Sequence, residues 1–282
     1  MFTPEAVIIP NCEYVFGTIL LDKRGVFAME VLERRRAFKV VAGAGLAVAG
    51  LAADAQDSTA IDRALTELHL RLQQVPARRN YSSLPAILTS KSQWDSESLE
   101  LLFHYRGGVK QLWDNTDIAS GWLAVIRNCL NTHQFALKTR GYLPVCGTRG
   151  SAQLALYDNE AWDKYELGHL IHDQPSHNPF QPDVKGLSLP HDPNSDFSAS
   201  IFGDEGATVT ALRERGTLFL ACHNATYELA RHLHMAGHVP AGQSVEETTA
   251  DLTNHLPPWV IVTPGVAAVL PILQQIGYHL SA

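Results

Sequence analysis

Cys222 is the residue of this chain whose position most favours thiol chemistry. It follows a short apolar run, 217–221, and precedes a segment with helical spacing, in which Leu229 and Leu233 stand four residues apart. The pattern predicts a strand, a tight turn and a helix, with Asn224 as the helix N-cap. Backbone N–H groups at a helix start favour a thiolate, and the carboxyl ends of parallel strands are common ligand sites. The alternative is a buried, inert cysteine, because free cysteine is among the most buried residue types.

Further residues are candidates to work with this thiol. His223 adjoins it and offers a proton acceptor or a cation, whereas a surface position beside a turn is the alternative. Cys146 ends a second predicted strand, so both thiols are expected at one edge of the sheet. They would form a redox pair or a disulfide if their Cα atoms came within about 6 Å. Asp114 and Arg149 close predicted strands and are candidates to line a pocket, Arg149 for an anion such as thiosulfate. An Asx turn at Asp114 and a solvated Arg149 are the alternatives.

A histidine-rich stretch favours a different class, a metal-binding protein. His232, His234 and His238 follow Cys222, and together they offer soft and borderline ligands. The spacing argues against a shared ion, since His232 and His234 point to different sides of a helix and Gly237 ends that helix before His238. We therefore predict no metal site. A third class, a non-catalytic oligomeric binding module, gains weight if Cys222 is buried.

Composition excludes several function classes. The chain has 282 residues, 45% of them hydrophobic, which is enough for one domain with extensions. Its formal charge of -7 and the lack of a basic stripe argue against a nucleic-acid partner. A stable membrane span is not expected, because no uncharged apolar run reaches about 18 residues. No glycine-rich nucleotide-binding pattern occurs, so we expect no organic cofactor.

Residues 29–55 have the organisation of a signal peptide. An arginine cluster precedes an apolar stretch rich in glycine and alanine, which ends in an A-x-A cleavage signal. The sequence R-R-A-F at 35–38 resembles the twin-arginine export motif. It departs from that motif at Arg34, where Ser or Thr is usual, and at Lys39, where Leu is usual, so the general secretory route stays open. We expect export to the periplasm, with 1–28 as an over-long start.

The remaining periodicity predicts strands alternating with helices. Residues 56–108 are predicted to form a helical extension and linker, with helices at 57–75 and 96–105. An α/β domain follows at 109–282, and an insertion at 169–204, rich in proline and histidine, is expected to be a lid or a solvated loop. Strands are predicted at 109–114, 142–146, 217–221, 258–262 and 278–280. The alternation indicates a mostly parallel β-sheet with helices on both faces.

Two motifs carry a family resemblance. One is the step Cys222-His223-Asn224, and the other is V-I-V-T-P-G-V at 260–266, with L-Q-Q-I-G-Y at 273–278. With these motifs, residues 109–280 resemble the DsrE/DsrF-like family of small sulfur-relay proteins. The resemblance implies a DsrE-like fold, a homo-oligomer, and a cysteine that passes sulfane sulfur between partners as a persulfide. That role falls to Cys222.

The combined expectation is an exported protein of DsrE-like α/β fold that binds or relays sulfane sulfur. Cys222 and His223 are the predicted catalytic pair, and Asn224, Asp114, Arg149 and Cys146 the predicted substrate-binding residues. Its partners would be a small sulfur species or a sulfur-carrier protein.

Overall fold

The computed structural model describes residues 47–171, 177–182 and 201–281, with side chains from residue 60 onward. The segment 1–28, most of the expected signal peptide 29–55 and most of the insertion 169–204 lie outside the described residues. Ala47–Ala282 form one compact unit. No helix among the described residues combines the length and the apolar character needed to cross a membrane.

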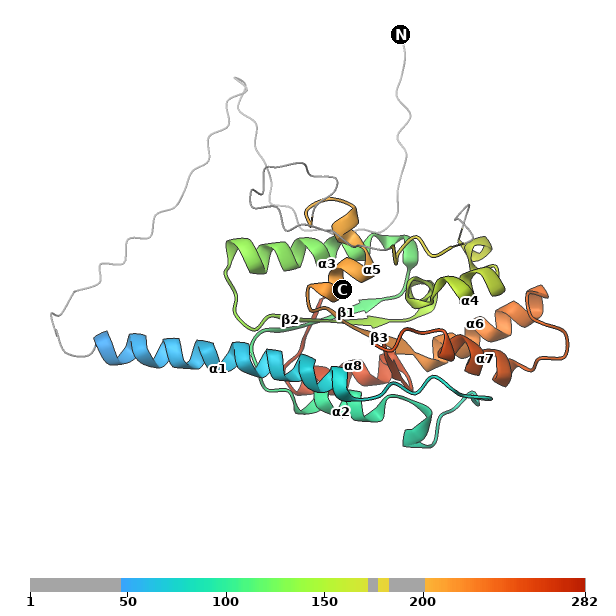
Figure 1. Ribbon diagram of the computed structural model, residues 1–282, viewed down its shortest axis with the longest axis horizontal. Helices are drawn as coiled ribbons and strands as arrows, with labels where there is room; N and C mark the ends of the chain where they lie inside the picture. The colour runs from blue at the N-terminus through green and yellow to red at the C-terminus, as the bar shows by residue number, and fades with distance from the viewer. Residues whose placement is uncertain (1–46, 172–176, 183–200, 282) are drawn as a thin grey trace, which may run out of the picture. The chain divides into compact units, whose positions relative to one another are not determined.

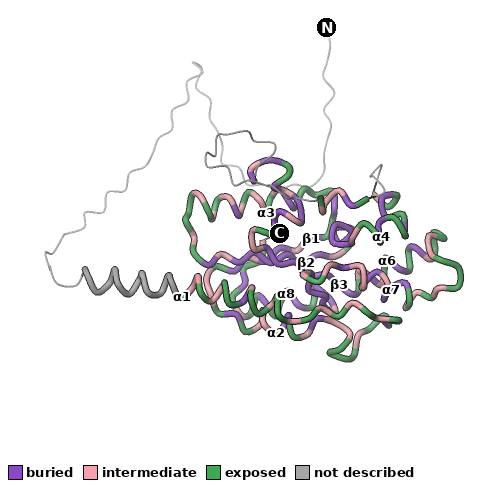
Figure 2. The backbone as a smooth tube through the Cα atoms, viewed as in Figure 1, coloured by how far each residue is buried: buried purple, intermediate pink, exposed green. Residues whose placement is uncertain are grey.

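The sheet is built from parallel strands, as the alternation predicts. In the part of the chain that the structure describes, five strands pair in the order β4-β3-β2-β1-β5, and every pairing is parallel (Figure 1). The bounds are β1 Lys110–Asn115, β2 Leu143–Thr148, β3 Leu218–Cys222, β4 Ile261–Thr263 and β5 His279–Ser281. Strands β2, β3 and β4 are buried at every position, which explains their continuous apolar sequence (Figure 2).

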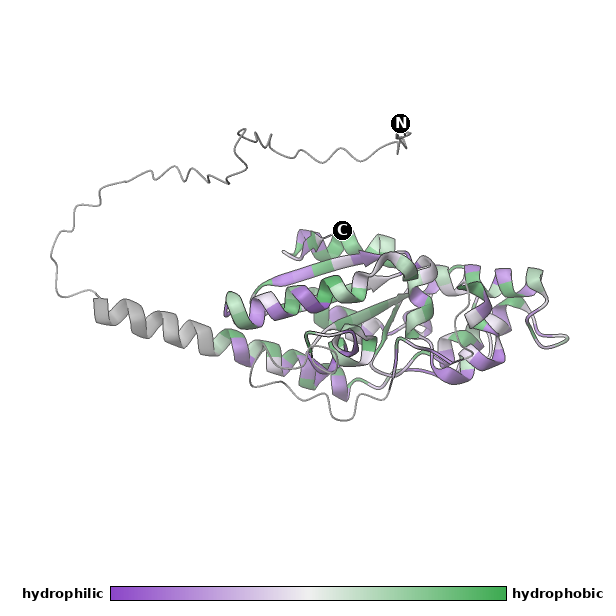
Figure 3. Ribbon diagram, turned by 90° about the horizontal axis from the view of Figure 1, so that it is seen from above, coloured by the Kyte–Doolittle hydropathy of each residue, from purple (hydrophilic) through white to green (hydrophobic). Residues whose placement is uncertain are grey.

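The helices occupy both faces of the sheet, which confirms the predicted class. They are α1 Ala47–Gln74, α2 Ser96–His104, α3 Trp122–Asn131, α4 Asn159–Lys164, α5 Val209–Glu214, α6 His223–Ala236, α7 Val245–Asn254 and α8 Val266–Gln275. Residues of α3 to α7 pack on one face, together with Trp113, Cys146 and Phe219. Residues of α1, α2 and α8 pack on the other, together with Leu112, Val145 and Cys222. Alternating polar and apolar bands around the helices mark their two sides (Figure 3).

The helix boundaries follow local sequence signals. Ser244 begins α7 with the predicted capping box, in which its hydroxyl accepts from the Glu247 N–H at 3.1 Å and the Glu247 carboxylate accepts from the Ser244 N–H at 2.7 Å. Gly237 ends α6 in the left-handed region at φ 78°, as expected for a C-cap glycine. After α3 the chain makes a π-helical turn at Thr132–Ala136.

Two expectations about strand and helix ends are wrong. Cys146 lies inside β2, because the strand continues for two more residues to Thr148. Cys222 itself is the N-cap of α6, and Asn224 is the second residue of that helix. The helix therefore begins two residues earlier than predicted, and the Gln153 amide oxygen, from a distant segment, accepts the Cys222 N–H at 2.7 Å.

The linker after α1 covers the outer edge of β4. The Asp95 N–H donates to the Val262 carbonyl at 3.0 Å, and the Val262 N–H donates to the Asp95 carboxylate at 2.8 Å. One linker residue thus satisfies an edge strand that would otherwise present free backbone groups. Residues 56–108 are therefore part of the packed domain, since α1 and α2 also contribute to its core.

Candidate functional site

The backbone of Cys222 is held by a buried polar cluster. Its N–H donates to Gln153, whose amide nitrogen donates to the hydroxyls of Thr226 at 2.7 Å and Tyr157 at 3.0 Å. The Thr226 hydroxyl donates to the Cys222 carbonyl at 3.3 Å, so the hydrogen bonds form a closed ring that begins and ends at Cys222. Gln153, Tyr157 and Thr226 are all buried. This cluster fixes the end of β3 and the start of α6 in one position.

The Cys222 sulfur faces the start of a second helix. The backbone N–H of Val266, the first residue of α8, donates to Sγ at 3.4 Å. Cys222 is also the N-cap residue of α6, although its side chain accepts no hydrogen bond from the N–H groups of that helix. The residue is only 4% exposed, so protein atoms cover it almost completely.

Arg149 and Asp114 stand at the same edge of the sheet. The guanidinium donates through Nε and Nη2 to both carboxylate oxygens of Asp114, each at 2.8 Å. Hydrogen bonding to Asp114 raises the pKa of Arg149; burial opposes this, while the charges of Asp114 and of a Cys222 thiolate add to it. The Arg149 side chain is 38% exposed, so it is the more accessible part of the group. Asn224 lies against the start of α8, since a Cβ added at Gly265 would stand 3.0 Å from its amide nitrogen.

His223 is held by the linker. Its Nε2 donates to the Pro85 carbonyl at 2.7 Å, and the residue is fully buried. Burial lowers the pKa of His223, although hydrogen bonds to the Pro85 and Ala86 backbone raise it. The neutral ring then carries its proton on Nε2, and among the described residues Nδ1 has no partner. The structure thus directs this histidine to the linker, and its contacts support a role in docking that segment.

The structure does not bring the cysteines together. Cys146 packs on the face of α3 to α7, whereas Cys222 packs on the face of α1, α2 and α8. The redox pair or disulfide that a shared strand end would have allowed is not formed, because the two side chains project from opposite sides of the sheet. Burial raises the pKa of Cys146 well above its usual value, with the Asn115 side chain opposing this. Within the described residues Cys129, Cys146 and Cys222 are all free thiols.

The histidines of α6 are also separated from Cys222. His232 follows it by ten helical residues, which corresponds to about 15 Å along the axis. His234 contacts the Thr248 hydroxyl at 3.0 Å, and His238 pairs with Glu166 at 2.8 Å. Each histidine has its own environment, so this set does not form a common ion site.

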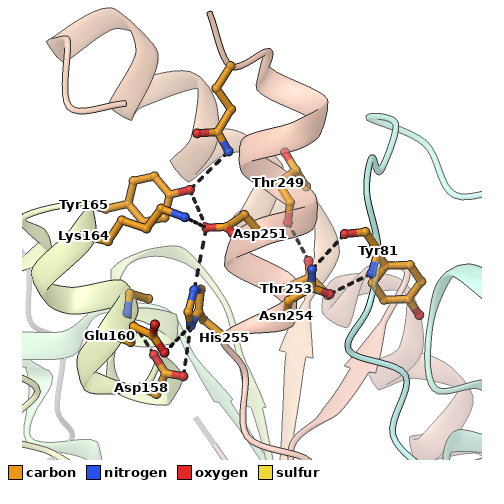
Figure 4. Close-up of polar contacts among 12 residues, drawn as sticks. Tyr81, Asp158, Glu160, Lys164, Tyr165, Thr249, Asp251, Thr253, Asn254 and His255 are labelled. Carbon is orange, nitrogen blue, oxygen red and sulfur yellow. Dashed lines mark hydrogen bonds and ion pairs between the residues drawn. The ribbon is translucent and has the colours of Figure 1, made fainter. Parts of the chain in front are cut away.

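A different group has donors at metal-binding spacing. Donor atoms of Asp158, Glu160 and His255 lie within 4.8 Å of one another. The protein already uses two of these side chains, because Asp158 caps α4 through the Ala161 N–H at 2.9 Å and accepts from His255 Nδ1 at 3.1 Å. This geometry is typical of a charge network that joins α4 to α7 (Figure 4).

The same network extends through the second nitrogen of His255. Its Nε2 lies 3.8 Å from Asp251, which also accepts from Lys164 at 2.7 Å and Tyr165 at 2.6 Å (Figure 4). Hydrogen bonding to Asp158 raises the pKa of His255; burial opposes this, and the charges of Asp158, Asp251 and Glu160 add to it. A protonated imidazole between two carboxylates is the form this arrangement stabilises.

One further group of residues lies at the amino ends of the strands, and no sequence pattern indicates it. A cavity of about 380 Å³ there is lined by residues that include His133, Lys138 and Arg215. These residues come from separate parts of the chain and have no motif spacing, although the positive φ of Lys138 at 51° marks unusual backbone there.

Comparison with models of protein families, with curated proteins and with solved structures gives no match. Function is therefore inferred from the geometry of the chain itself.

Proposed function

We propose that this protein carries sulfane sulfur on Cys222 as a persulfide. The observation that carries the proposal is the position of Sγ at the starts of α6 and α8, with the Val266 N–H directed at it. A thiolate and a persulfide anion both gain from these donors. The resemblance of residues 109–280 to DsrE/DsrF-like proteins supports the same residue.

The reaction needs no external oxidant or reductant when thiosulfate is the donor. The Cys222 thiolate attacks the outer sulfur of thiosulfate, a new S–S bond forms, and the S–S bond of the donor breaks. Sulfite leaves with the electron pair of that bond. Asp114 fixes the guanidinium of Arg149, and we assign this cation the binding of the incoming thiosulfate dianion.

Burial of the sulfur determines what can react with it. Because Cys222 is 4% exposed, access requires the side chains around it to move. The Arg149 side chain is 38% exposed at this end of the sheet, so we place the entry path of the donor on its side of the sulfur. Small donors such as thiosulfate or polysulfide fit this requirement better than a bulky persulfide, and delivery to a sulfur-carrier protein would use the same opening.

Mass spectrometry of the intact protein tests this proposal. Treatment with thiosulfate or polysulfide should add one sulfur atom, which a reductant removes, and Cys222→Ser should abolish the gain. Cys129→Ser is the matched control, because it removes a partly exposed free thiol and should leave the gain intact. If the wild type gains no sulfur, or Cys222→Ser gains as much, the proposal fails.

A non-catalytic binding module is the second candidate, and the burial of Cys222 is the observation that favours it. In that case the folded protein gains no sulfur, whereas the urea-unfolded chain reacts at all of its cysteines. The metal-binding alternative has less support, because the α6 histidines lie apart from Cys222.

The same proposal places the protein in the periplasm as a homo-oligomer. Segment 29–55 would direct export, so an Arg35→Lys/Arg36→Lys chain should remain in the cytoplasmic fraction if the twin-arginine route is used. Light scattering of the purified protein measures the oligomeric state.

A further inference from the structure

A cavity lies at the amino ends of β2 and β3, whereas Cys222 lies at the carboxyl end of β3. It has a volume of about 380 Å³. Leu65 of α1 and Leu130 of α3 form apolar walls, Tyr142 precedes β2, and Arg215 is the C-cap residue of α5. The remaining lining residues are His133, Gln134, Lys138, Thr139 and Gly141. The size is within the range of small-molecule sites.

Arg215 brings an unpaired positive charge to this cavity. Its Nη2 donates to the Gln134 side chain at 3.2 Å, while Nε and Nη1 are buried and have no acceptor among the described residues. The charged neighbour that acts on it is Arg127, which is repulsive. Burial, with a smaller contribution from Arg127, lowers the pKa of Arg215 to about 10, so the group is still protonated at neutral pH. A buried cation without a counterion is unfavourable.

The other polar groups of the cavity do not supply the missing anion. None of its described lining residues is acidic, although the chain as a whole has a net charge of -7. Lys138 adds a second cation, and its side chain is exposed. His133 contacts the Thr139 hydroxyl at 2.8 Å and stacks on Tyr142, with ring centroids 3.8 Å apart.

The backbone around the cavity is held in uncommon conformations. The π-helical turn Thr132–Ala136 places His133 and Gln134 at the wall, and Lys138 follows with φ 51°, in the left-handed region. π-turns and non-glycine residues at positive φ are unfavourable and cluster at functional sites. The uncommon backbone conformations therefore lie at the same cavity as the Arg215 guanidinium, which has no counterion among the described residues.

We propose that this cavity binds an organic oxyanion, whose carboxylate or phosphate group pairs with Arg215 and Lys138 and whose apolar body packs against Leu65, Leu130 and Tyr142. Nε and Nη1 of Arg215 are covered by neighbouring atoms. Binding therefore turns the guanidinium toward the cavity and breaks its hydrogen bond to Gln134, the one that it makes with the described residues. The site is independent of Cys222, since it lies at the other end of the strands.

Calorimetric titration of the full chain with phenyl phosphate, benzoate and inorganic phosphate tests the proposal. Phenyl phosphate or benzoate should bind more tightly than inorganic phosphate, because only the first two have an apolar body. Arg215→Gln should weaken this binding about tenfold or more, the usual effect of losing one charge-assisted hydrogen bond. Arg231→Gln removes the same charge from an exposed ion pair on α6 and should have no effect.

Three outcomes would overturn the proposal. They are the absence of heat with all three probes, equal binding by Arg215→Gln and the wild type, and equal weakening by Arg231→Gln. Tighter binding of inorganic phosphate than of phenyl phosphate would overturn the apolar part. If Arg215→Gln fails to fold by circular dichroism, Lys138→Gln decides instead, because this exposed side chain is not needed for folding. It should weaken binding several-fold, and unchanged binding refutes the site.

Discussion

Two half-buried arginines occupy opposite electrostatic situations in this protein. Arg79, in the linker, donates to both oxygens of Asp95 at 3.2 and 3.1 Å and to the carbonyls of Leu256, Arg78 and Val260. Arg215, at the amino-end cavity, donates to a single acceptor among the described residues, the Gln134 side chain. All three guanidinium nitrogens of Arg79 donate hydrogen bonds, whereas one nitrogen of Arg215 donates to a described residue.

The difference separates a structural arginine from one available to a ligand. Arg79 joins the linker to the chain that enters β4, and its partner Asp95 also continues the β4 edge. Its charge is compensated within the fold. Among the described residues the charge of Arg215 has no counterion, and a fold retains such a cost most readily where another molecule supplies the partner.

The largest expected effect is that of Arg79→Met. This change leaves the Asp95 carboxylate, 4% exposed, without its cation and should lower the free energy of unfolding by about 3–5 kcal/mol. Urea unfolding followed by circular dichroism measures it. If Arg79→Met lowered the free energy of unfolding by less than about 1 kcal/mol, Arg79 would not be a structural arginine and would not differ from Arg215.

A smaller loss is expected at Gln153, a neutral group that is as fully bonded as Arg79. Gln153→Ala leaves the Cys222 N–H and the hydroxyls of Tyr157 and Thr226 without their shared partner. The cost should be about 1–3 kcal/mol, since the Cys222 N–H loses its acceptor and the two hydroxyls lose a donor, but no charge is stranded. The same urea experiment applies, and faster alkylation of Cys222 should accompany the loss. Unchanged stability would show that the cluster does not hold the turn.

The His255 network should show a smaller effect that depends on pH. The pKa of His255 is raised in the folded protein, so its contribution is full below the unfolded value of 6.5 and is lost as pH rises through the folded value. The pKa of Asp158 and of Asp251 is lowered: burial raises each, but hydrogen bonds from His255 and from Lys164 with Tyr165 outweigh it. Their contributions are lost as pH falls.

Stability from this network is therefore greatest at weakly acidic pH. His255→Asn should flatten the pH profile of the unfolding midpoint, with a change below about 1 kcal/mol because solvent screens the Asp158 carboxylate, 41% exposed. An identical profile in the variant would contradict the charged form of His255.

Arg215→Met is the matched counterpart of Arg79→Met and has the smallest expected effect. It removes an uncompensated cation and one hydrogen bond, so the free energy of unfolding should change by less than about 1 kcal/mol, in the stabilising direction. Parallel urea titrations of the two methionine variants provide the comparison. A loss as large as that of Arg79→Met would mean that Arg215 is structural.

The fold class follows from the sequence because hydrophobic periodicity is local. The strand before Cys222, the helix after it and the capping box at Ser244 all appear at the expected places. The side on which a residue projects is also local, yet it depends on the exact register. For Cys146, two additional strand residues change an expected edge position into a core position.

The sequence does not indicate which polar groups become hydrogen-bond partners. Arg79 and Asp95 are only sixteen residues apart, but the carbonyls that complete the site come from Leu256 and Val260. Gln153 meets Cys222 across 69 residues. No periodicity encodes such contacts, because they arise when separate elements pack together. The cavity at Arg215 was missed for the same reason.

The pairing of β5 with β1 has a consequence for the newly made chain. The Gln111 side chain bonds to Ser281, 170 positions later, and the backbones of the two strands pair alongside it. At an elongation rate of about 5–20 residues per second, β1 leaves the ribosome roughly 10–30 s before its outer neighbour exists. During that interval its outer edge has no partner strand, so the nascent chain is most prone to misassociation there. Synthesis in the presence of a holdase chaperone should therefore raise the soluble yield.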